Sequence, residues 1–373
     1  MRSNRTTRWA AALALVALAA CTPTTPTPTP GAPAFTVGVA AAGLDHPWEV
    51  AFTPDGTMLV TERPGRILAV VGGVARTLGA PPDARSTSEG GMLGLAVDPN
   101  FATNRRIYAC FQSVSGGSPD ERVVRWTVDG GYTALANRAD IVTGIPLTSG
   151  RHTGCRLRFG PDGALWVTTG DAARTDTAQN PASLGGKILR VTTDGVGAAG
   201  NPGGALDPRI FTLGHRNVQG LSFRPTDGRA YSIEQGTGCD DEVNMPIAGG
   251  NYGWNPGALG FYNEAAPMTD TATVPGAIAA AWRSGCPTIA TSGGSFISSP
   301  RWGAWNGALA MAALAGQQLR VIRFGAGAAP AVEQQWTALT GRGRLRTVTQ
   351  GPDGDLFVPL DATAGQILRL TPT

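Results

Sequence analysis

The segment from Gly214 to Trp254 contains the densest mixture of cationic, acidic and glycine residues in the chain. It opens with Arg216 and Asn217, which suit an anionic or carbonyl-bearing ligand because both side chains donate hydrogen bonds to oxygen. It then enters an acidic segment, residues 234–244. Carboxylates and backbone carbonyls on a flexible chain suit a hard cation such as Ca²⁺. The EF-hand spacing is absent, and a solvated turn is the alternative.

Of the three histidines, His152 is the strongest candidate for a general base. It immediately precedes an apolar, strand-like segment that begins near Cys155. An imidazole that is neutral near pH 7 can accept a proton from a reacting hydroxyl. A histidine held by hydrogen bonds in a structural role is the alternative.

Arg344 and Arg346 flank Leu345, and at the two-residue period of a β-strand their side chains point to one face. Two like charges side by side are costly unless an anion lies between them, so the pair is a candidate anion site. Two surface arginines are the alternative. The chain contains no nucleophile elbow, P-loop, dinucleotide fingerprint or His-Glu-x-x-His motif. Hydrolases and nucleotide-binding proteins therefore lack their usual signals here.

A repeated unit along the chain must position these residues. Each unit consists of an apolar strand, a turn of the Pro-Asp-Gly type and a second apolar strand, and such turns favour hairpins. The turn prolines are Pro54, Pro99, Pro161, Pro225, Pro300 and Pro352. Six such units predict an all-β fold, a six-bladed β-propeller with four-stranded antiparallel blades. Two stacked β domains are the alternative, but no linker is visible near the middle of the chain.

Composition and cysteine content restrict the class of protein. The 373 residues include 52 glycines and 28 prolines but only 15% charged residues, with a net charge of +3. No basic stripe occurs, so we expect no nucleic-acid partner. In an exported chain, four cysteines favour two disulfides over metal ligation. Three pairings are possible, and the blade layout favours Cys110–Cys155 and Cys239–Cys286.

The N-terminal residues are expected to direct export. Residues 1–21 combine a basic start with a short apolar stretch and end in a lipobox-like sequence at Cys21. We expect cleavage before Cys21 and lipidation of its thiol; an ordinary secretory signal is the alternative. Residues 22–34 alternate Thr and Pro and form an extended linker, and residues 35–373 form the propeller. The protein is thus expected at the cell envelope, touching the membrane only through its lipid anchor.

A set of short motifs recurs in the order expected of one known family. They are Pro47-Trp48, Thr61–Arg66, Gly90–Leu95, His152–Gly163, Gly185–Arg190, Gly214–Leu221, Glu234–Gly236, Asp241–Asn244, Asn251–Trp254 and Gly343–Arg346. With these motifs the chain resembles the soluble quinoprotein glucose/sorbosone dehydrogenases, including bacterial aldose sugar dehydrogenases, over roughly Leu44 to Leu370. The resemblance implies a six-bladed propeller, in agreement with the repeat count.

The resemblance also implies a cofactor, pyrroloquinoline quinone (PQQ), bound together with Ca²⁺. His152 matches the catalytic base, which takes the proton of the anomeric hydroxyl during hydride transfer to the quinone. Arg216 and Asn217 match residues that contact the quinone oxygens and stabilise developing negative charge. Arg344 and Arg346 match the pair that neutralises the cofactor carboxylates.

The metal ligands implied by the resemblance fall in the acidic segment. The backbone carbonyls of Gly236 and Thr237 match ligands of the cofactor-bound Ca²⁺, and Gln235 lies beside them at the cofactor. A separate structural Ca²⁺ site is matched by Asp241, Glu242 and Tyr252.

Three residues depart from the family pattern. A cofactor-binding lysine is replaced by Ala315, a glutamine in the cofactor site by Glu89, and a proline by Thr237. Thr237 matters least because its ligand atom is a carbonyl. Losing a cation and gaining a carboxylate beside an anionic cofactor costs on the order of a few kcal/mol of binding.

These observations predict an envelope-anchored, PQQ- and Ca²⁺-dependent enzyme that oxidises aldose sugars at C1 to lactones, with an electron acceptor that the sequence does not identify. The alternative is a non-catalytic, calcium-stabilised propeller lipoprotein that binds carbohydrate or protein. Ala315 and Glu89 favour that alternative. A Ca²⁺-dependent lactonase is a third hypothesis, and it would require carboxylate and Asn ligands along the propeller axis.

Overall fold

A computed structural model describes residues 31–327 and 329–373 of the chain. The predicted signal segment and Cys21 lie outside the described residues. Within the described part, no helix has the length and apolar character needed to cross a membrane.

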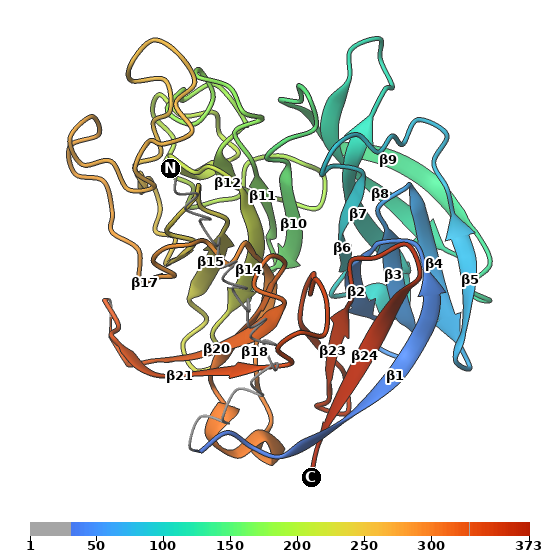
Figure 1. The fold of residues 1–373 in the computed structure, drawn as a ribbon. Coiled ribbons are helices and arrows are strands. Elements are labelled where there is room, and N and C mark those ends of the chain that lie inside the picture. Colours follow the sequence, from blue (N-terminus) through green and yellow to red (C-terminus); the bar gives the residue numbers. More distant parts are fainter. Residues whose placement is uncertain (1–30, 328) are drawn as a thin grey trace, which may run out of the picture.

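The described chain folds into six four-stranded antiparallel sheets arranged as the blades of a propeller, as the repeats predict (Figure 1). Blade 1 contains β2 (Pro47–Phe52), β3 (Met58–Glu62), β4 (Arg66–Val71) and β5 (Val74–Gly79). Blade 2 contains β6 (Met92–Val97), β7 (Arg106–Ser113), β8 (Asp120–Val128) and β9 (Leu135–Ile145). Blade 3 contains β10 (Gly154–Phe159), β11 (Leu165–Thr169), β12 (Lys187–Val191) and β13 (Ile210–Leu213).

The remaining three blades follow the same order. Blade 4 contains β14 (Val218–Phe223), β15 (Ala230–Glu234), β16 (Glu242–Asn244) and β17 (Trp282–Arg283). Blade 5 contains β18 (Thr291–Phe296), β19 (Leu309–Ala313), β20 (Gln318–Phe324) and β21 (Val332–Ala338). Blade 6 contains β22 (Thr349–Gln350), β23 (Leu356–Pro359), β24 (Gly365–Pro372) and, from the N-terminal end, β1 (Phe35–Leu44). The described helices are the short α1 (Phe101–Asn104) and the 3-10 helix η1 (Pro300–Trp305).

Each predicted turn joins the first and second strands of its blade. In blade 3 the turn closes with a hydrogen bond from the amide of Gly160 to the carbonyl of Ala164, 2.9 Å long. The carboxylate of Asp162 accepts the amide of Ala164 at 3.1 Å, and Gly163 has a φ of +76°. That dihedral favours glycine. Local turn chemistry therefore sets the hairpin, and all these turns lie at the same end of the blades.

Strand β1 closes the ring. It pairs antiparallel with β24 from Phe35 opposite Pro372 to Leu44 opposite Gly365, so the two ends of the described chain lie in one sheet (Figure 1). The ring of Phe35 lies 5.6 Å from that of Trp305, between centroids. The outer strand of the last blade comes from the start of the chain. Separating β1 from β24 would therefore expose this aromatic contact and an unpaired sheet edge.

Both predicted disulfides are present. Cys110 on β7 is bonded to Cys155 on β10, which ties blade 2 to blade 3. Cys239, in the loop after β15, is bonded to Cys286, in the segment before β18. The second bond therefore fastens the acidic segment to the chain that enters blade 5.

The first strands of successive blades contact one another, and a buried polar network links them. The fully buried Arg156 on β10 pairs with Glu49 on β2, donates to the carbonyl of Gln219 on β14 at 2.8 Å, and lies 3.8 Å over the ring of Trp48. Burial favours the neutral form of Glu49, but Arg156 and Arg158 outweigh it and hold its pKa below the usual range. Breaking such a pair leaves an unpaired buried charge.

Glu121 on β8 is a buried carboxyl that offers a test of stability against pH. The Oε1 atom of Glu121 has no hydrogen-bond partner among the described residues. In the sheet, Glu121 lies opposite Gln112 on β7. Burial, followed by the charges of Glu89 and Asp120, raises its pKa well above the ordinary value of 4.5. The stability that its neutral form contributes is complete below the unfolded-state pKa and is lost as the pH rises through the folded-state pKa.

We therefore expect Glu121→Gln to become more stable relative to the native protein as the pH rises from about 5 to about 8, with the difference growing by up to about 1.4 kcal/mol for each step of one in pH. Thermal unfolding of both proteins across this range measures the difference. Glu333→Gln, at an exposed position, is the control and should follow the native curve. Parallel curves for Glu121→Gln and the native protein would contradict the expectation.

Candidate active site

The candidate residues gather at the end of the blades opposite the Pro-Asp-Gly turns. His152 precedes β10, Arg216 and Asn217 precede β14, and Gln235 follows β15. The backbone of Asn217 forms an isolated bridge with Gly170, so blades 3 and 4 are joined at this point. Residues that are far apart in sequence thus meet because each lies at the same end of its blade.

His152 is buried and held by Asp171, which follows β11. The Nδ1 of His152 lies 2.8 Å from Oδ1 of Asp171, which also accepts the amide of Ala173 at 2.8 Å. The other oxygen, Oδ2, accepts the indole N–H of Trp254 at 2.6 Å and the hydroxyl of Tyr262 at 2.8 Å. A carboxylate partner places the imidazole hydrogen on Nδ1 and leaves Nε2 as the proton acceptor.

Glu89 lies directly beside this base. One carboxylate oxygen accepts the backbone N–H of His152 at 2.7 Å, and the other lies 3.4 Å from Nδ2 of Asn217. The carboxylate thus braces the turn that carries His152. It also places a negative charge among residues predicted to contact an anionic cofactor, as expected from the sequence.

A chain of amides links Asn217 to Arg346. The Oδ1 of Asn217 accepts the amide of Gly154 at 3.0 Å, and its Nδ2 lies 3.4 Å from Oε1 of Gln235. That oxygen also accepts Nε2 of Gln219 at 3.2 Å, while Oε1 of Gln219 accepts Nη1 of Arg346 at 3.1 Å. Gln219 was not a candidate from sequence, yet it connects the two predicted halves of the site.

Arg216 is buried and points toward the acidic segment. Its Nη1 donates to the carbonyls of Gln235 at 3.1 Å and Gly236 at 2.7 Å, and its Nη2 lies 3.2 Å from Oε2 of Glu264. Its Nε has no partner among the described residues. The free Nε is a buried donor that an oxygen of a ligand would satisfy.

Arg344 and Arg346 both lie close to one anionic group, and that group is a carboxylate of the protein itself. The carboxylate of Asp361, which follows β23, lies 2.6 Å from Nη2 of Arg346 and 3.4 Å from Nε of Arg344. Burial opposes ionisation of Asp361, but Arg346, Arg344 and Arg63 together lower its pKa.

Around Asp361, the positively charged side chains outnumber the negatively charged ones. Three guanidinium groups face one carboxylate, and the Nε atoms of Arg63 and Arg346 are buried without a partner among the described residues. An excess of buried donors and positive charge fits a ligand with carboxylate groups. The cofactor predicted from sequence has that chemistry.

The acidic segment is organised by protein partners. The carboxylate of Asp241 accepts the amide of Gly236 at 3.0 Å, the hydroxyl of Thr288 at 2.7 Å and the amide of Ile289 at 2.7 Å. It therefore braces the loop whose carbonyls were predicted to bind Ca²⁺. The hydroxyl of Tyr252 donates to the carbonyl of Met245.

Glu242 is buried, and its oxygens accept the hydroxyl of Thr269 at 2.9 Å and Nδ2 of Asn244 at 3.2 Å. Burial, followed by the charge of Glu234, raises its pKa to about 7. Within residues 31–327 and 329–373, no group of three or more His, Cys, Asp or Glu side chains is placed to hold a metal ion. The side chains of Asp241, Glu242 and Tyr252 have separate hydrogen-bond partners, and the carbonyl of Gly236 accepts Nη1 of Arg216. Both calcium sites, with Gly236 and Thr237 as ligands of one, stay predictions.

The position that departs from the family lysine, Ala315, is exposed and follows β19 directly after Leu314. The neighbouring amides of Leu314 and Gly316 donate to Ala290 and Ile289, each at 2.9 Å. A side chain at this position has room to extend into solvent, so the loss of the lysine is a loss of charge and not of packing.

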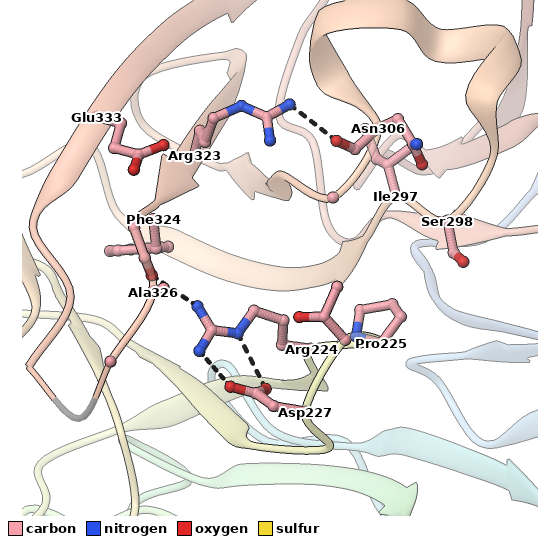
Figure 2. A pocket seen from close by; sticks show the side chains of 14 residues that line it. Arg224, Pro225, Asp227, Ile297, Ser298, Asn306, Arg323, Phe324, Ala326 and Glu333 are labelled. Atoms are coloured by element: carbon pink, nitrogen blue, oxygen red, sulfur yellow. Dashed lines mark hydrogen bonds and ion pairs between the residues drawn. The ribbon is translucent and has the colours of Figure 1, made fainter.

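One large pocket lies at the opposite end of the blades and contains none of the candidate residues (Figure 2). Its lining comes from the β14–β15 turn and from the chain around β20. Arg224 pairs with Asp227 and donates to the carbonyl of Gly325 at 2.8 Å, and Arg323 donates to the carbonyl of Asn306 at 2.8 Å. With these cations already occupied by protein oxygens, we assign the pocket no chemistry.

Sequence reasoning missed Asp171, Asp361, Gln219 and Tyr262. Asp171 and Asp361 each lie two residues after the second strand of their blade, and Gln235 lies one residue after β15. A comparison of the two residues that follow the second strand in each repeat would therefore have indicated both aspartates. No comparable signal exists for Tyr262, which lies in a long loop outside the repeats.

Comparison with known proteins places these features in context. Residues 44–369 match the family described as Glucose / Sorbosone dehydrogenase. The chain is 31% identical to aldose sugar dehydrogenase YliI of Escherichia coli over 365 residues, covering 91% of this chain and 94% of that protein.

Solved structures are similar over nearly the whole chain. A putative oxidoreductase (glucose dehydrogenase) from Thermus thermophilus has 35% identity and a TM-score of 0.79, covering 90% of this chain and 100% of that one. The PQQ-bound form of an aldose sugar dehydrogenase from Streptomyces coelicolor has 32% identity and a TM-score of 0.76, covering 91% and 99%.

Proposed function

The chain belongs to the glucose/sorbosone dehydrogenase family of oxidoreductases, and on that basis we propose that it oxidises aldose sugars at C1 with PQQ as its cofactor. The observation that carries this proposal is the buried His152–Asp171 pair, placed beside Arg216 and Asn217. The alternative, a non-catalytic propeller, would have no need for a buried histidine whose free nitrogen is a base.

The proton transfer follows from the geometry of the pair. Asp171 accepts Nδ1–H of His152, so Nε2 is free to take the proton of the C1 hydroxyl. The imidazolium that forms is stabilised by the adjacent carboxylate of Asp171. Trp254 and Ala173 donate to that carboxylate and hold it in place. These contacts fix the orientation of the base before substrate arrives.

The arginine-rich part of the site would hold the cofactor. Arg344 and Arg346, together with Arg63, would neutralise its carboxylates, while Arg216 and Asn217 would donate to quinone oxygens. When bound, PQQ supplies a two-electron acceptor. The Streptomyces relative described as PQQ-bound supports the same cofactor here.

Three further parts of the proposal rest on the sequence: the product, the anchor and the metal ion. The product is a lactone, the electron acceptor is not identified, and the protein is anchored at the cell envelope through Cys21. Ca²⁺ binds at the carbonyls of Gly236 and Thr237. Thr237 lines a pocket with Asp240 and Glu264, and carboxylates there would accept sugar hydroxyls.

Reconstitution tests the proposal. The purified protein is mixed with micromolar PQQ and Ca²⁺, and a difference spectrum and dye reduction are recorded with several aldoses. We expect a spectrum of bound quinone and sugar-dependent reduction, both of which should weaken after chelation of Ca²⁺. Absence of quinone binding would contradict the proposal and favour the non-catalytic alternative.

A further inference from the structure

The loop of residues 255–281 lies between Trp254 and β17. It belongs to none of the repeats and extends beyond the strands of blade 4, where the chain is coloured yellow to orange (Figure 1). Tyr262 and Glu264 on this loop nevertheless reach residues of the site that come from other segments.

Tyr262 contacts both members of the catalytic pair. Its hydroxyl lies 2.8 Å from Oδ2 of Asp171 and 3.1 Å from Nδ1 of His152. Burial, followed by the charge of Asp171, raises the pKa of Tyr262 above its usual value, so the phenol keeps its hydrogen. A phenol has only one hydrogen, and Asp171 receives it, so the Tyr262 oxygen can only accept from Nδ1 of His152.

Nδ1 of His152 therefore faces two acceptors, Asp171 and Tyr262. Two acceptors at one ring nitrogen favour the tautomer that carries hydrogen there more strongly than one acceptor does. With Tyr262 in place, Nε2 is the unprotonated nitrogen, which is the state required of the base.

Glu264 fastens the loop in this position. Its Oε2 lies 3.2 Å from Nη2 of Arg216, and its other oxygen pairs with Arg151, the residue before His152. Burial disfavours the charged form of Glu264, but Arg151 and Arg216 lower its pKa, so the carboxylate stays ionised. One carboxylate thus links the loop to the segment that carries the base and to a predicted cofactor contact.

We propose that the 255–281 loop supplies Tyr262 as a positioning residue that, together with Asp171, holds His152 in the tautomer with hydrogen on Nδ1, and that Glu264 latches the loop to Arg151 and Arg216. Only the effect on catalysis rests on the proposed function. The tautomer of His152 can be measured in the protein without cofactor, independently of any activity.

Nitrogen NMR of histidine-labelled protein tests the proposal directly. The chain has three histidines, and Nδ1 of His46 and of His215 faces Asp45 and Glu234, so two imidazoles away from the catalytic pair serve as internal references. In the cofactor-free native protein we expect His152 to show a protonated Nδ1 and a bare Nε2. In Tyr262→Phe we expect a shift toward a mixture of tautomers, with the other two histidines unchanged.

Kinetics of the reconstituted enzyme give a second readout. We expect Tyr262→Phe to lower kcat roughly three- to tenfold with little change in KM, and to displace the acidic limb of the pH–rate profile. Glu264→Gln, which keeps Tyr262 but weakens the latch, should change both measurements in the same direction by less. Tyr231→Phe is the matched control, because the Tyr231 hydroxyl is buried without a partner among the described residues.

A native tautomer for His152 in both folded variants would overturn the proposal. A shifted tautomer supports the proposal even if the protein reduces no dye, because the NMR measurement does not depend on dehydrogenase activity. If Tyr262→Phe does not fold, Glu264→Gln alone decides the outcome by the same spectra.

Discussion

Replacing His152 with alanine lowers kcat for aldose oxidation by roughly 10²- to 10⁴-fold, the usual contribution of a positioned general base. We expect the variant to retain the proposed PQQ binding, because the arginines around Asp361 and the amide of Asn217 are untouched. The loss arises because Nε2 of His152 is the acceptor that the Asp171 pairing leaves free.

Asp171→Asn should cause a loss of similar kind. An amide in place of the carboxylate can donate to Nδ1, which favours the opposite tautomer and removes the charge that stabilises the imidazolium. Steady-state dye reduction gives kcat for each variant, and the PQQ difference spectrum confirms cofactor loading.

Asp98→Asn is the matched control for the second substitution. Asp98 is also buried and accepts the hydroxyl of Tyr108 at 2.9 Å, but it lies at the Pro-Asp-Gly end of blade 2. The activity of Asp98→Asn per folded molecule should equal that of the native enzyme.

Full activity in cofactor-loaded His152→Ala would contradict the assignment of His152 as the base.

Restoring the two family residues at the cofactor site should raise PQQ affinity strongly. We expect Glu89→Gln and Ala315→Lys each to lower the Kd about tenfold, which corresponds to about 1.4 kcal/mol, and the double variant to lower it about 100-fold if the effects add. Glu89→Gln removes a negative charge beside an anionic ligand but keeps an oxygen that can accept the N–H of His152. Ala315→Lys adds a cation at an exposed position.

Titration of each variant with PQQ at two salt concentrations measures these effects. Because both substitutions act through charge, the gain should shrink as ionic strength rises. Glu333→Gln, on the exposed outer strand of blade 5, changes the net charge equally and should leave Kd unchanged. An unchanged Kd in the double variant would show that these positions do not face the cofactor.

The fold followed from local chemistry. A proline at each turn, with a glycine in every turn except the one at Pro99, favours a hairpin from neighbouring residues alone, so counting the turns gave six blades. The pairs Cys110–Cys155 and Cys239–Cys286 followed from the same layout and are both present. The closing strand β1 was not expected to join the last blade, because the repeat does not show which blade is completed by the other end of the chain.

The site was predicted in part. His152, Arg216, Asn217, Gln235, Arg344 and Arg346 were singled out by residue type and by resemblance, and contacts within the structure connect them. The hydrogen-bond partners of these residues could not be predicted, because the partners come from other segments of the chain and their separation in sequence follows no pattern. The carboxylate between Arg344 and Arg346 is that of Asp361, and the side chains of Asp241 and Tyr252 form hydrogen bonds with other parts of the chain.

By itself, then, the sequence determined the propeller, the disulfides and the set of polar residues at one end of the blades, because turns and repeats act over short stretches of chain. Only the tertiary structure decided that Asp171 orients His152, that Glu89 braces it, and that Tyr262 and Glu264 reach the same base from a loop outside the repeats. Hydrogen bonds extend over about 3 Å, and contacts of that length between distant residues depend on how the blades close into a ring.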